Sequence, residues 1–476
     1  MKGILNAVWL VSLFCQLSRT VELTLDEDDS IKSAASTLAF GLMRYYTGNN
    51  TGDVPGNLPS PYFWWEAGAL FGTMVDYWFL TKDESYTAVI KQALLHQAGD
   101  DRDYMPANQT STEGNDDQGF WAMAAMSAAE NKFPDPPSDQ PQWLALAQAV
   151  FNEYTTRWDT STCNGGLRWQ IFTFNNGYNY KNSIANGCFF NIAARLARFT
   201  GNQTYADWAQ RVFEWEQATS LITSDYQIRD GAGTDDGANC TKPDTVQWTY
   251  NAGIYMHGSA MMYNITTGHA QDTWKQRLDG IINETTATFF NNSIMVEQAC
   301  EDADLCDTDQ QSFKGYLARW MAGTTQVAPY TFDTIMPLLR KTAAAAGRAC
   351  SGSPASGFSG QPGTACGFRW TTAEAEEEEG FDGQPGVGQQ MNGLSAIMYT
   401  LTKRAVAGSG DAGGESTVPV TADTGGTSQG DPNAGVEVAD EMPALAPVTM
   451  GERVAAGFMT SAIALGVIAG GVFAVK

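Results

Sequence analysis

The sequence predicts an all-α fold, an (α/α)6 barrel in which six helical hairpins form a toroid. From about Leu25 to Arg404, apolar residues recur with helical rather than strand spacing, and no linker divides this stretch. The 476 residues, 43% of them hydrophobic, can bury a large core. A multi-helix bundle is the structural alternative, because the helix spacing is not a clean sequence repeat.

Twelve helices are expected, in order over residues 29–47, 63–80, 83–98, 117–130, 141–157, 183–199, 204–219, 247–266, 271–290, 309–321, 331–346 and 387–403. Turn chemistry separates them, for example FPDPP at 133–137 and TGN at 200–202. The helices over 117–130 and 247–266 are apolar nearly all round, as inner helices of a barrel would be. The others carry a charged face, so the twelve helices pair into six hairpins.

The two ends of the chain are predicted to be processing signals around a helical body over 21–404. Residues 1–20 contain one lysine, a short apolar run and small residues, the pattern of a cleaved signal peptide. Residues 405–453 are rich in Gly, Ser, Thr and Pro, which predicts a disordered stalk. The apolar tail over 454–476 fits a GPI-attachment signal better than a membrane span, with residues 433–435 (NAG) as the attachment triplet.

Sequons and cysteines also indicate a secreted, disulfide-bonded glycoprotein. N-x-Ser/Thr sequons occur at Asn49, Asn108, Asn202, Asn239, Asn264, Asn283 and Asn291. Cys15 leaves with the signal peptide, while Cys300 with Cys306 and Cys350 with Cys366 could each close a short loop. The other three, Cys163, Cys188 and Cys240, leave one thiol free or paired elsewhere. The expected location is the outer face of the plasma membrane.

Composition excludes several partners. Lys and Arg number 28 against 53 Asp and Glu, and the net charge of -25 would repel a nucleic acid. Only three histidines are present, so a zinc or other His-rich metal site is not expected. No cofactor is predicted. Abundant aromatic residues and scarce charge suit a protein that stacks against neutral rings such as sugars.

Residues 113–121 (EGNDDQGFW) carry the adjacent aspartates Asp116 and Asp117 at the start of a predicted helix. Helix capping explains such residues simply, because Asp and Asn favour helix N-termini. The functional interpretation is a carboxylate pair for glycosidic cleavage, which needs one ionised carboxylate and one protonated acid. Mutual repulsion would raise one pKa, while helix-end N–H groups could hold the other low. Asp116 and Asp117 are therefore candidate catalytic residues.

Three further segments supply candidate substrate-binding residues. Tandem tryptophans beside a carboxylate at 61–70 could stack a pyranose and bind its hydroxyls, although core packing explains at least one of them. The Gly-Gly pair at 165–166 lets backbone approach a ligand, and the Asp-Asp pair at 235–236 is a rival for catalysis, but plain turns explain both. The candidates are Trp64, Trp65, Glu66, Arg168, Trp169, Lys181, Asn182, Asp230, Asp235, Asp236, Tyr250 and Asn251.

Taken together, WWEAG at 64–68, NDDQ at 115–118, GGLRWQ at 165–170, KNS at 181–183 and TYNAG at 249–253 resemble glycoside hydrolase family 76. The resemblance covers about 25–400 and is to fungal GPI-anchored members named mannan endo-1,6-α-mannosidases. It implies an (α/α)6 barrel and action on α-1,6-linked mannose with retention of configuration. It also implies that Asp116 is the nucleophile and Asp117 the general acid/base.

The resemblance therefore predicts a retaining endo-α-1,6-mannosidase of the fungal plasma membrane and wall, acting on mannan or GPI glycan. As a transglycosidase it would link GPI proteins to a β-glucan acceptor, because a sugar hydroxyl can replace water at the covalent intermediate. The alternatives are a catalytically silent mannan-binding or wall-structural protein, a metal-dependent enzyme, and an inverting enzyme using a distant pair such as Glu66 and Asp236.

Overall fold

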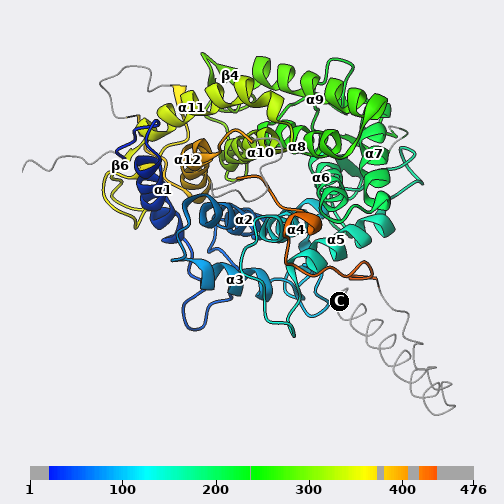
Figure 1. The fold of residues 1–476 in the computed structure, drawn as a ribbon, viewed down its shortest axis with the longest axis horizontal. Coiled ribbons are helices and arrows are strands. Elements are labelled where there is room, and N and C mark those ends of the chain that lie inside the picture. The colour runs from blue at the N-terminus through cyan, green and yellow to red at the C-terminus, as the bar shows by residue number, and fades with distance from the viewer. Residues whose placement is uncertain (1–20, 236, 238, 372–379, 406–416, 437–476) are drawn as a thin grey trace, which may run out of the picture. The chain divides into compact units, whose positions relative to one another are not determined.

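The computed structural model describes residues 21–235, 237, 239–371, 380–405 and 417–436, and twelve α-helices in these ranges confirm the all-α prediction. Six helices form a closed inner ring, in which each contacts the next: α2 (Trp64–Thr81), α4 (Asn115–Glu130), α6 (Ser183–Thr200), α8 (Thr249–Ile265), α10 (Phe313–Val327) and α12 (Val387–Met398). The outer helices are α1 (Asp28–Met43), α3 (Thr87–His96), α5 (Trp143–Arg157), α7 (Gln203–Ala218), α9 (Gly268–Phe289) and α11 (Phe332–Ala349). The two concentric rings make the predicted (α/α)6 barrel (Figure 1).

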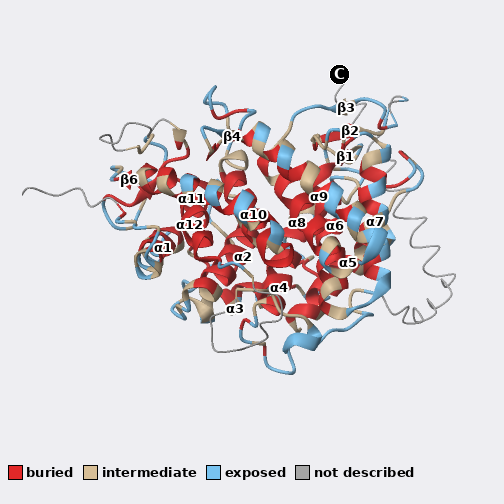
Figure 2. Cartoon of the chain, turned by 45° about the horizontal axis from the view of Figure 1, so that its top comes forward, coloured by how far each residue is buried: buried red, intermediate tan, exposed pale blue. Residues whose placement is uncertain are grey.

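Burial separates the two rings, as Figure 2 shows. Every residue of α12 is buried, whereas outer helix α9 buries seven of its 22 residues. An inner helix packs against ring neighbours and outer helices at once, so it needs apolar or small residues on all sides. This requirement explains why the predicted helices over 117–130 and 247–266 are uniformly apolar.

The helix boundaries lie within five residues of the sequence prediction, except at the end of α10. The predicted helix over 309–321 begins later, at Phe313 after a 3₁₀ turn (Gln310–Ser312), and continues to Val327. Its last turns contain Gly and Thr, which are weak helix formers, but Ala322, Thr324 and Thr325 are buried. Packing in the ring therefore overrides local propensity at this helix end.

In the described ranges, three small antiparallel sheets lie between helices, and the sequence analysis predicted none of them. The sheet near the candidate site joins β1 (Tyr180–Asn182), β2 (Gly231–Gly233) and β3 (Pro243–Asp244), with Asn182 opposite Gly231. The hairpins are β4 (Phe290–Asn291) with β5 (Ile294–Met295), and β6 (Cys350–Gly352) with β7 (Ala365–Cys366). Strands of two or three residues are too short to show alternation in a sequence.

Disulfides join Cys300 to Cys306 and Cys350 to Cys366, as the spacing suggested. A third disulfide joins Cys163 to Cys240 across 77 residues of sequence and leaves Cys188 as a buried thiol. Of the three cysteines that spacing could not pair, Cys188 is therefore the free one.

Residues 417–435, which we name the C-terminal strap, lie against the barrel. Arg198 donates to the carbonyls of Pro419 and Val420, and the Leu144 N–H donates to Ser428 Oγ. The predicted attachment triplet lies here too, where Asn152 Nδ2 donates to the Ala434 carbonyl. The prediction of a disordered stalk is therefore wrong for these residues, because polar low-complexity composition did not reveal their bonds to the helices.

Among the described residues, no helix is both long and apolar enough to cross a membrane. The predicted signal peptide over 1–20 and the predicted anchor tail over 454–476 lie outside the described residues.

Candidate active site

A cleft of about 590 Å³ opens at the end of the barrel where the inner helices begin. Its walls include Trp64 and Trp65 at the start of α2, Asp116 and Asp117 at the start of α4, and Tyr250 at the start of α8. The positive ends of several helix dipoles therefore meet around the cleft, which favours negative groups there.

Asp116 and Asp117 lie in the first turn of α4, where their own hydrogen bonds fix them. Asp117 Oδ2 accepts the Gly114 N–H at 2.6 Å, and Asp116 Oδ1 accepts the Asp117 N–H at 3.1 Å. Asn182 Nδ2 donates to Asp116 Oδ2 at 3.3 Å from the end of β1. The sequence prediction of a capping role is thus correct for Asp117, and the same geometry presents both carboxyls to the cleft.

Gly114 limits how far apart the two carboxyls lie. A methyl group placed on Gly114 would lie 2.3 Å from Asp116 Oδ1 and 3.2 Å from Asp117 Oδ2. These two distances set an upper limit of about 5.5 Å on the separation of the two oxygens. A side chain at position 114 would therefore push the Asp116 carboxyl out of its present position.

The electrostatic environment raises both pKa values. Burial raises the pKa of Asp116 well above its usual range, and the neighbouring charge of Asp117 adds to this shift. Burial also raises the pKa of Asp117 to about 7, although the Gly114 N–H opposes the change. The pair therefore retains a proton in mildly acidic solution, where ordinary aspartates are ionised. One protonated and one ionised carboxyl can coexist, as glycosidic cleavage requires.

Aromatic rings form much of the cleft wall. Tyr250 stacks on Phe313 with ring centroids 3.8 Å apart, and Trp169 is 38% exposed. Trp65 packs against Phe120 at 4.8 Å, while Trp64 stacks on Trp121 behind the wall. These faces suit the apolar faces of sugar rings, and both tandem tryptophans line the cleft as well as contacting the core.

Asp230 supplies another carboxyl on the wall. The Tyr180 hydroxyl donates to Asp230 Oδ2 at 2.7 Å and Trp248 Nε1 donates to Oδ1 at 3.0 Å. Burial raises the pKa of this aspartate. Two donors on separate elements hold its orientation toward the cleft.

Strand alternation separates the candidates on β1. Tyr180 and Asn182 line the cleft, whereas the side chain of Lys181 points to the other face of the strand. Lys181 is fully buried, and its Nζ donates to the carbonyls of Asp159, Thr162 and Gly165.

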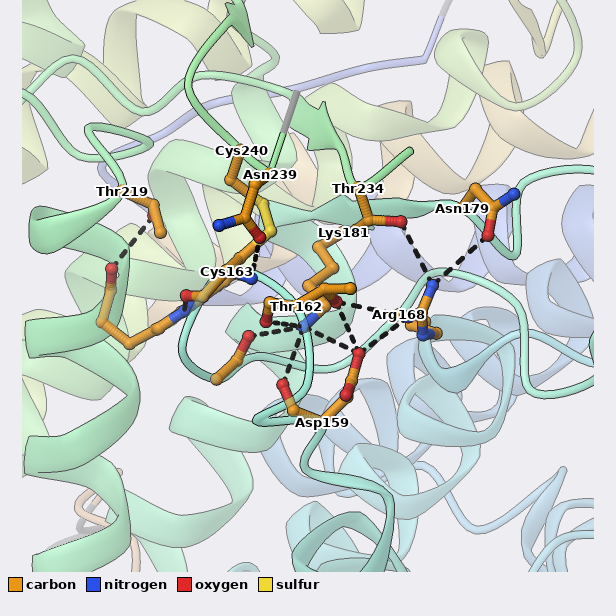
Figure 3. Close-up of a disulfide and its surroundings, with 12 residues drawn as sticks. Asp159, Thr162, Cys163, Arg168, Asn179, Lys181, Thr219, Thr234, Asn239 and Cys240 are labelled. Atoms are coloured by element: carbon orange, nitrogen blue, oxygen red, sulfur yellow. Dashed lines mark hydrogen bonds and ion pairs between the residues drawn. A yellow bond between two sulfur atoms is a disulfide. The ribbon is translucent and has the colours of Figure 1, made fainter. Parts of the chain in front are cut away.

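The lysine belongs to a structural network around the Cys163–Cys240 disulfide (Figure 3). Arg168 pairs with Asp159 at 2.8 Å and donates to the Tyr178 carbonyl. Neither Lys181 nor Arg168 lines the cleft, so the structure does not bring these two predicted residues to the candidate site. A buried cation that holds a loop and a substrate-binding cation look the same in a sequence.

Three more candidates do not line the cleft. Glu66 is fully buried and its Oε2 accepts the Phe63 N–H, which caps α2; burial raises its pKa to about 8. Asn251 is fully buried inside α8, and Asp235 is exposed on a loop. Asp236 lies outside the described residues, so the structure does not place the second aspartate pair. The buried position of Glu66 argues against a distant acid–base pair that includes it.

Two acidic residues on the cleft wall were missed. Glu113 is 2% exposed, and burial raises its pKa to about 9. Asp309, just before the 3₁₀ turn that leads into α10, accepts a hydrogen bond from Trp65 Nε1 at 3.0 Å. An aspartate at the start of a predicted inner helix was a usable signal for Asp309, because Asp116 has the same placement. In the ranges that the structure covers, no group of three or more His, Cys, Asp or Glu side chains is arranged to hold a metal ion.

A helical toroid with paired carboxyls in a cleft lined by aromatic rings defines a class of protein, the glycoside hydrolases. Within that class the chain belongs to glycosyl hydrolase family 76, whose sequence profile matches residues 30–410.

Related proteins are similar in sequence to nearly the whole of this chain. Mannan endo-1,6-alpha-mannosidase DCW1 of Saccharomyces cerevisiae is 45% identical over 456 residues, covering 95% of each chain. A crystal structure of Dfg5 from Chaetomium thermophilum in complex with glucosamine is 44% identical, with a TM-score of 0.78 over 87% of this chain and 97% of that one. An alpha-1,6-mannanase of Salegentibacter, 16% identical with a TM-score of 0.58 over 78% of this chain and 98% of that one, shares the fold.

Proposed function

We propose that this glycoside hydrolase is a retaining endo-α-1,6-mannosidase. The observation that carries the proposal is the Asp116–Asp117 pair, whose nearest oxygens lie within about 5.5 Å of each other beside an aromatic-lined wall. Retaining enzymes hold their carboxyls about 5–5.5 Å apart, whereas inverting enzymes need roughly 6.5–9.5 Å to admit a water. Curated relatives that are 44–45% identical are named mannan endo-1,6-alpha-mannosidases, which supports α-1,6-linked mannose as the substrate.

The reaction has two steps. One carboxylate attacks the anomeric carbon while the other carboxylic acid gives its proton to the departing oxygen, so the glycosidic bond breaks and a glycosyl ester forms. The second carboxylate then takes a proton from water, and the resulting attack on the anomeric carbon releases the sugar and frees the first carboxylate. We assign Asp116 as nucleophile and Asp117 as acid/base, as the resemblance to family 76 implies. A pKa of about 7 for Asp117 is compatible with an acid that works below neutral pH.

We further propose that the protein is secreted, GPI-anchored at the outer face of the plasma membrane and wall, and able to transfer the glycosyl group to a sugar hydroxyl. The apolar N-terminal run and the apolar C-terminal tail support the location. A glycosyl ester that accepts water also accepts a hydroxyl, so GPI glycan as donor and β-glucan as acceptor fit the same chemistry.

The test uses residues 21–436 with an α-1,6-mannooligosaccharide, with and without a β-glucan oligosaccharide. Mass spectrometry would identify the products and NMR the anomer released first. The expected result is shorter α-anomeric products, absent in Asp116→Asn and Asp117→Asn and retained in the exposed-loop control Asp235→Asn. First release of the β-anomer would contradict retention, and binding without turnover in the wild type would identify a silent mannan-binding protein.

Azide separates the two roles of the pair. With an activated aryl mannoside, azide reacts with the glycosyl ester of an acid/base variant and gives an α-mannosyl azide, because the configuration inverts twice. We expect this product from the Asp117 variant. The same product from the Asp116 variant instead would reverse the assignment.

A further inference from the structure

Asp309 is a carboxyl in the cleft that the proposed reaction does not use. It precedes the turn leading into α10, and its wall position places it in the same cleft as Asp116 and Asp117. The Cys300–Cys306 disulfide closes the loop just before it, and the Ser312 N–H and hydroxyl both donate to the Asp309 carbonyl. The backbone that carries this carboxyl is therefore well fixed.

The two oxygens of Asp309 have different surroundings. Oδ1 accepts the indole N–H of Trp65 at 3.0 Å, whereas no described residue donates to Oδ2. Trp65 packs against Phe120 on one side, and Phe313, four residues after Asp309, stacks on Tyr250. The open oxygen thus lies on a wall made of aromatic faces, which is how sugar-binding sites place a carboxylate against ring hydroxyls.

We propose that Asp309 contacts the substrate: Oδ2 accepts a hydrogen bond from a hydroxyl of the sugar bound beside Asp116 and Asp117, while Trp65 holds Oδ1. A carboxylate is a stronger acceptor for a hydroxyl than an amide oxygen, and it leaves the orienting bond from the indole intact. This inference rests on the proposed function, because it assumes that the ligand of the cleft is a sugar chain.

The charge of Asp309 also acts on the catalytic pair. Burial is the main cause of the raised pKa of Asp117, and the Asp309 charge raises it further. Other titratable groups face the same cleft: Glu113, Asp116, Tyr180, Asp230 and Tyr250. Neutralising Asp309 alone removes one negative charge from this set, so the pKa of Asp117 falls and its proton is lost at lower pH.

The experiment compares the full-length protein with Asp309→Asn, Asp309→Ala and Asp302→Asn. The amide oxygen introduced by Asp309→Asn can still accept the Trp65 N–H, while Asp302→Asn removes the same charge from an exposed site on the neighbouring loop. In Asp309→Asn we expect KM for α-1,6-mannotetraose to rise about 10-fold and the basic limb of kcat/KM to move about half a pH unit lower. Asp309→Ala should raise KM further. Kinetics of Asp309→Asn equal to those of Asp302→Asn would overturn the inference.

A binding measurement keeps this inference separate from the proposed function. If the wild type does not cleave the tetrasaccharide, the proposed activity fails. Calorimetry at pH 7.5 then compares binding by the wild type and Asp309→Asn, because burial raises the pKa of Asp309 to about 6 and the carboxylate predominates above it. An affinity about 10-fold weaker in the variant would support the Asp309 contact even without turnover. Equal affinities, or no binding by either protein, would refute it.

Discussion

The two ends of the inner ring have opposite chemistry. At the N-terminal end, Asp116, Asp117, Asp230 and Asp309 line a cleft of about 590 Å³. At the C-terminal end, Arg195 and Arg319 line a cavity of about 70 Å³ together with two residues of the C-terminal strap. Both ends follow the helix dipole, which favours anions at helix N-termini and cations at C-termini.

The ends differ in whether their charges are paired. Arg195 bonds Glu130 at 2.6 Å, and Arg319 bonds Asp76 at 2.8 Å while the Tyr399 hydroxyl also donates to Asp76. The cleft acids have no cation among the described residues of the wall. Burial raises the pKa values of Asp116 and Asp117, and the charges of neighbouring carboxylates add to the rise. The comparison shows that the inner ring places structural and catalytic charges at opposite ends. Ion pairs stabilise one end, and carboxyls without a counter-charge are available for catalysis at the other.

The largest effect expected is loss of activity without loss of stability at the cleft. Asp117→Asn should lower kcat about 10³-fold or more, since it removes the proton donor. Its melting temperature should equal or exceed that of the wild type, because removing one of two crowded carboxyls relieves repulsion. Steady-state kinetics and scanning calorimetry on one preparation would check both. A melting temperature several degrees lower would show that this pair also holds the fold.

At the C-terminal end of the inner ring we expect the opposite result, a loss of stability without a loss of activity. Glu130→Gln leaves Arg195 buried without its counter-charge and should cost about 3–5 kcal/mol of unfolding free energy. Activity per folded molecule should stay near that of the wild type, since the pair is outside the cleft. Urea unfolding followed by tryptophan fluorescence gives the free energy. The double variant Glu130→Met with Arg195→Met serves as control and should lose less than the single change.

Removing the C-terminal strap should have a smaller effect of the same kind. Residues 21–404 lack the bonds from Arg198, Asn152 and Leu144, and should be less stable than 21–436 by roughly 2 kcal/mol. The substitution Gly430→Val should also weaken the contact between the strap and the barrel, because a Cβ there would lie 2.6 Å from Gln148 Oε1. Calorimetry of the three proteins checks this prediction. Equal melting temperatures would mean that the strap adds nothing to the barrel.

The smallest effect concerns pH. Burial raises the pKa of Glu113 to about 9, so between about pH 4 and 9 the folded chain binds a proton there that the unfolded chain has lost. Stability from this group is therefore complete below about pH 4 and is lost as pH rises through 9. Glu113→Gln should reduce the fall in melting temperature between pH 5 and 8.5 by roughly 2 °C. The exposed Glu84→Gln serves as control and should leave the fall unchanged.

At the C-terminal end of the inner ring, the pH dependence of stability has the opposite sign. Burial lowers the pKa of His257 well below its usual value, and the charge of Arg195 adds to this shift. The stability from a neutral His257 is present above about pH 6.5 and is lost as pH falls. The two ends therefore oppose each other in their pH dependence.

Most of the fold could be predicted because helical periodicity is a local property. All twelve predicted helices are present, and the apolar helices over 117–130 and 247–266 lie in the inner ring. The strap and the strands could not be predicted in this way. A residue such as Ser428 binds the barrel through its distant partner Leu144, and composition carries no record of that partner.

The candidate site was predictable in part because several of its residues form short local motifs at helix starts. Asp116, Asp117, Trp65, Trp169 and Tyr250 are on the cleft wall as expected. Lys181 was misplaced because its role depends on which face of β1 it occupies, and a three-residue strand does not show its pairing in sequence. Asp309 was missed because its place at the start of a predicted inner helix was not used as a signal, and because its hydrogen-bond partner Trp65 is distant in sequence.

The buried thiol of Cys188 is a probe of local opening in this barrel. Its sulfur lies where α6 meets α4, so close that a Cβ on Gly119 would be 2.7 Å from Sγ. In the described chain every other cysteine is oxidised, so a thiol reagent has one slow target. The labelling rate of Cys188 would report how often these two helices separate. A ligand that bridges α4 and α6 would lower this rate.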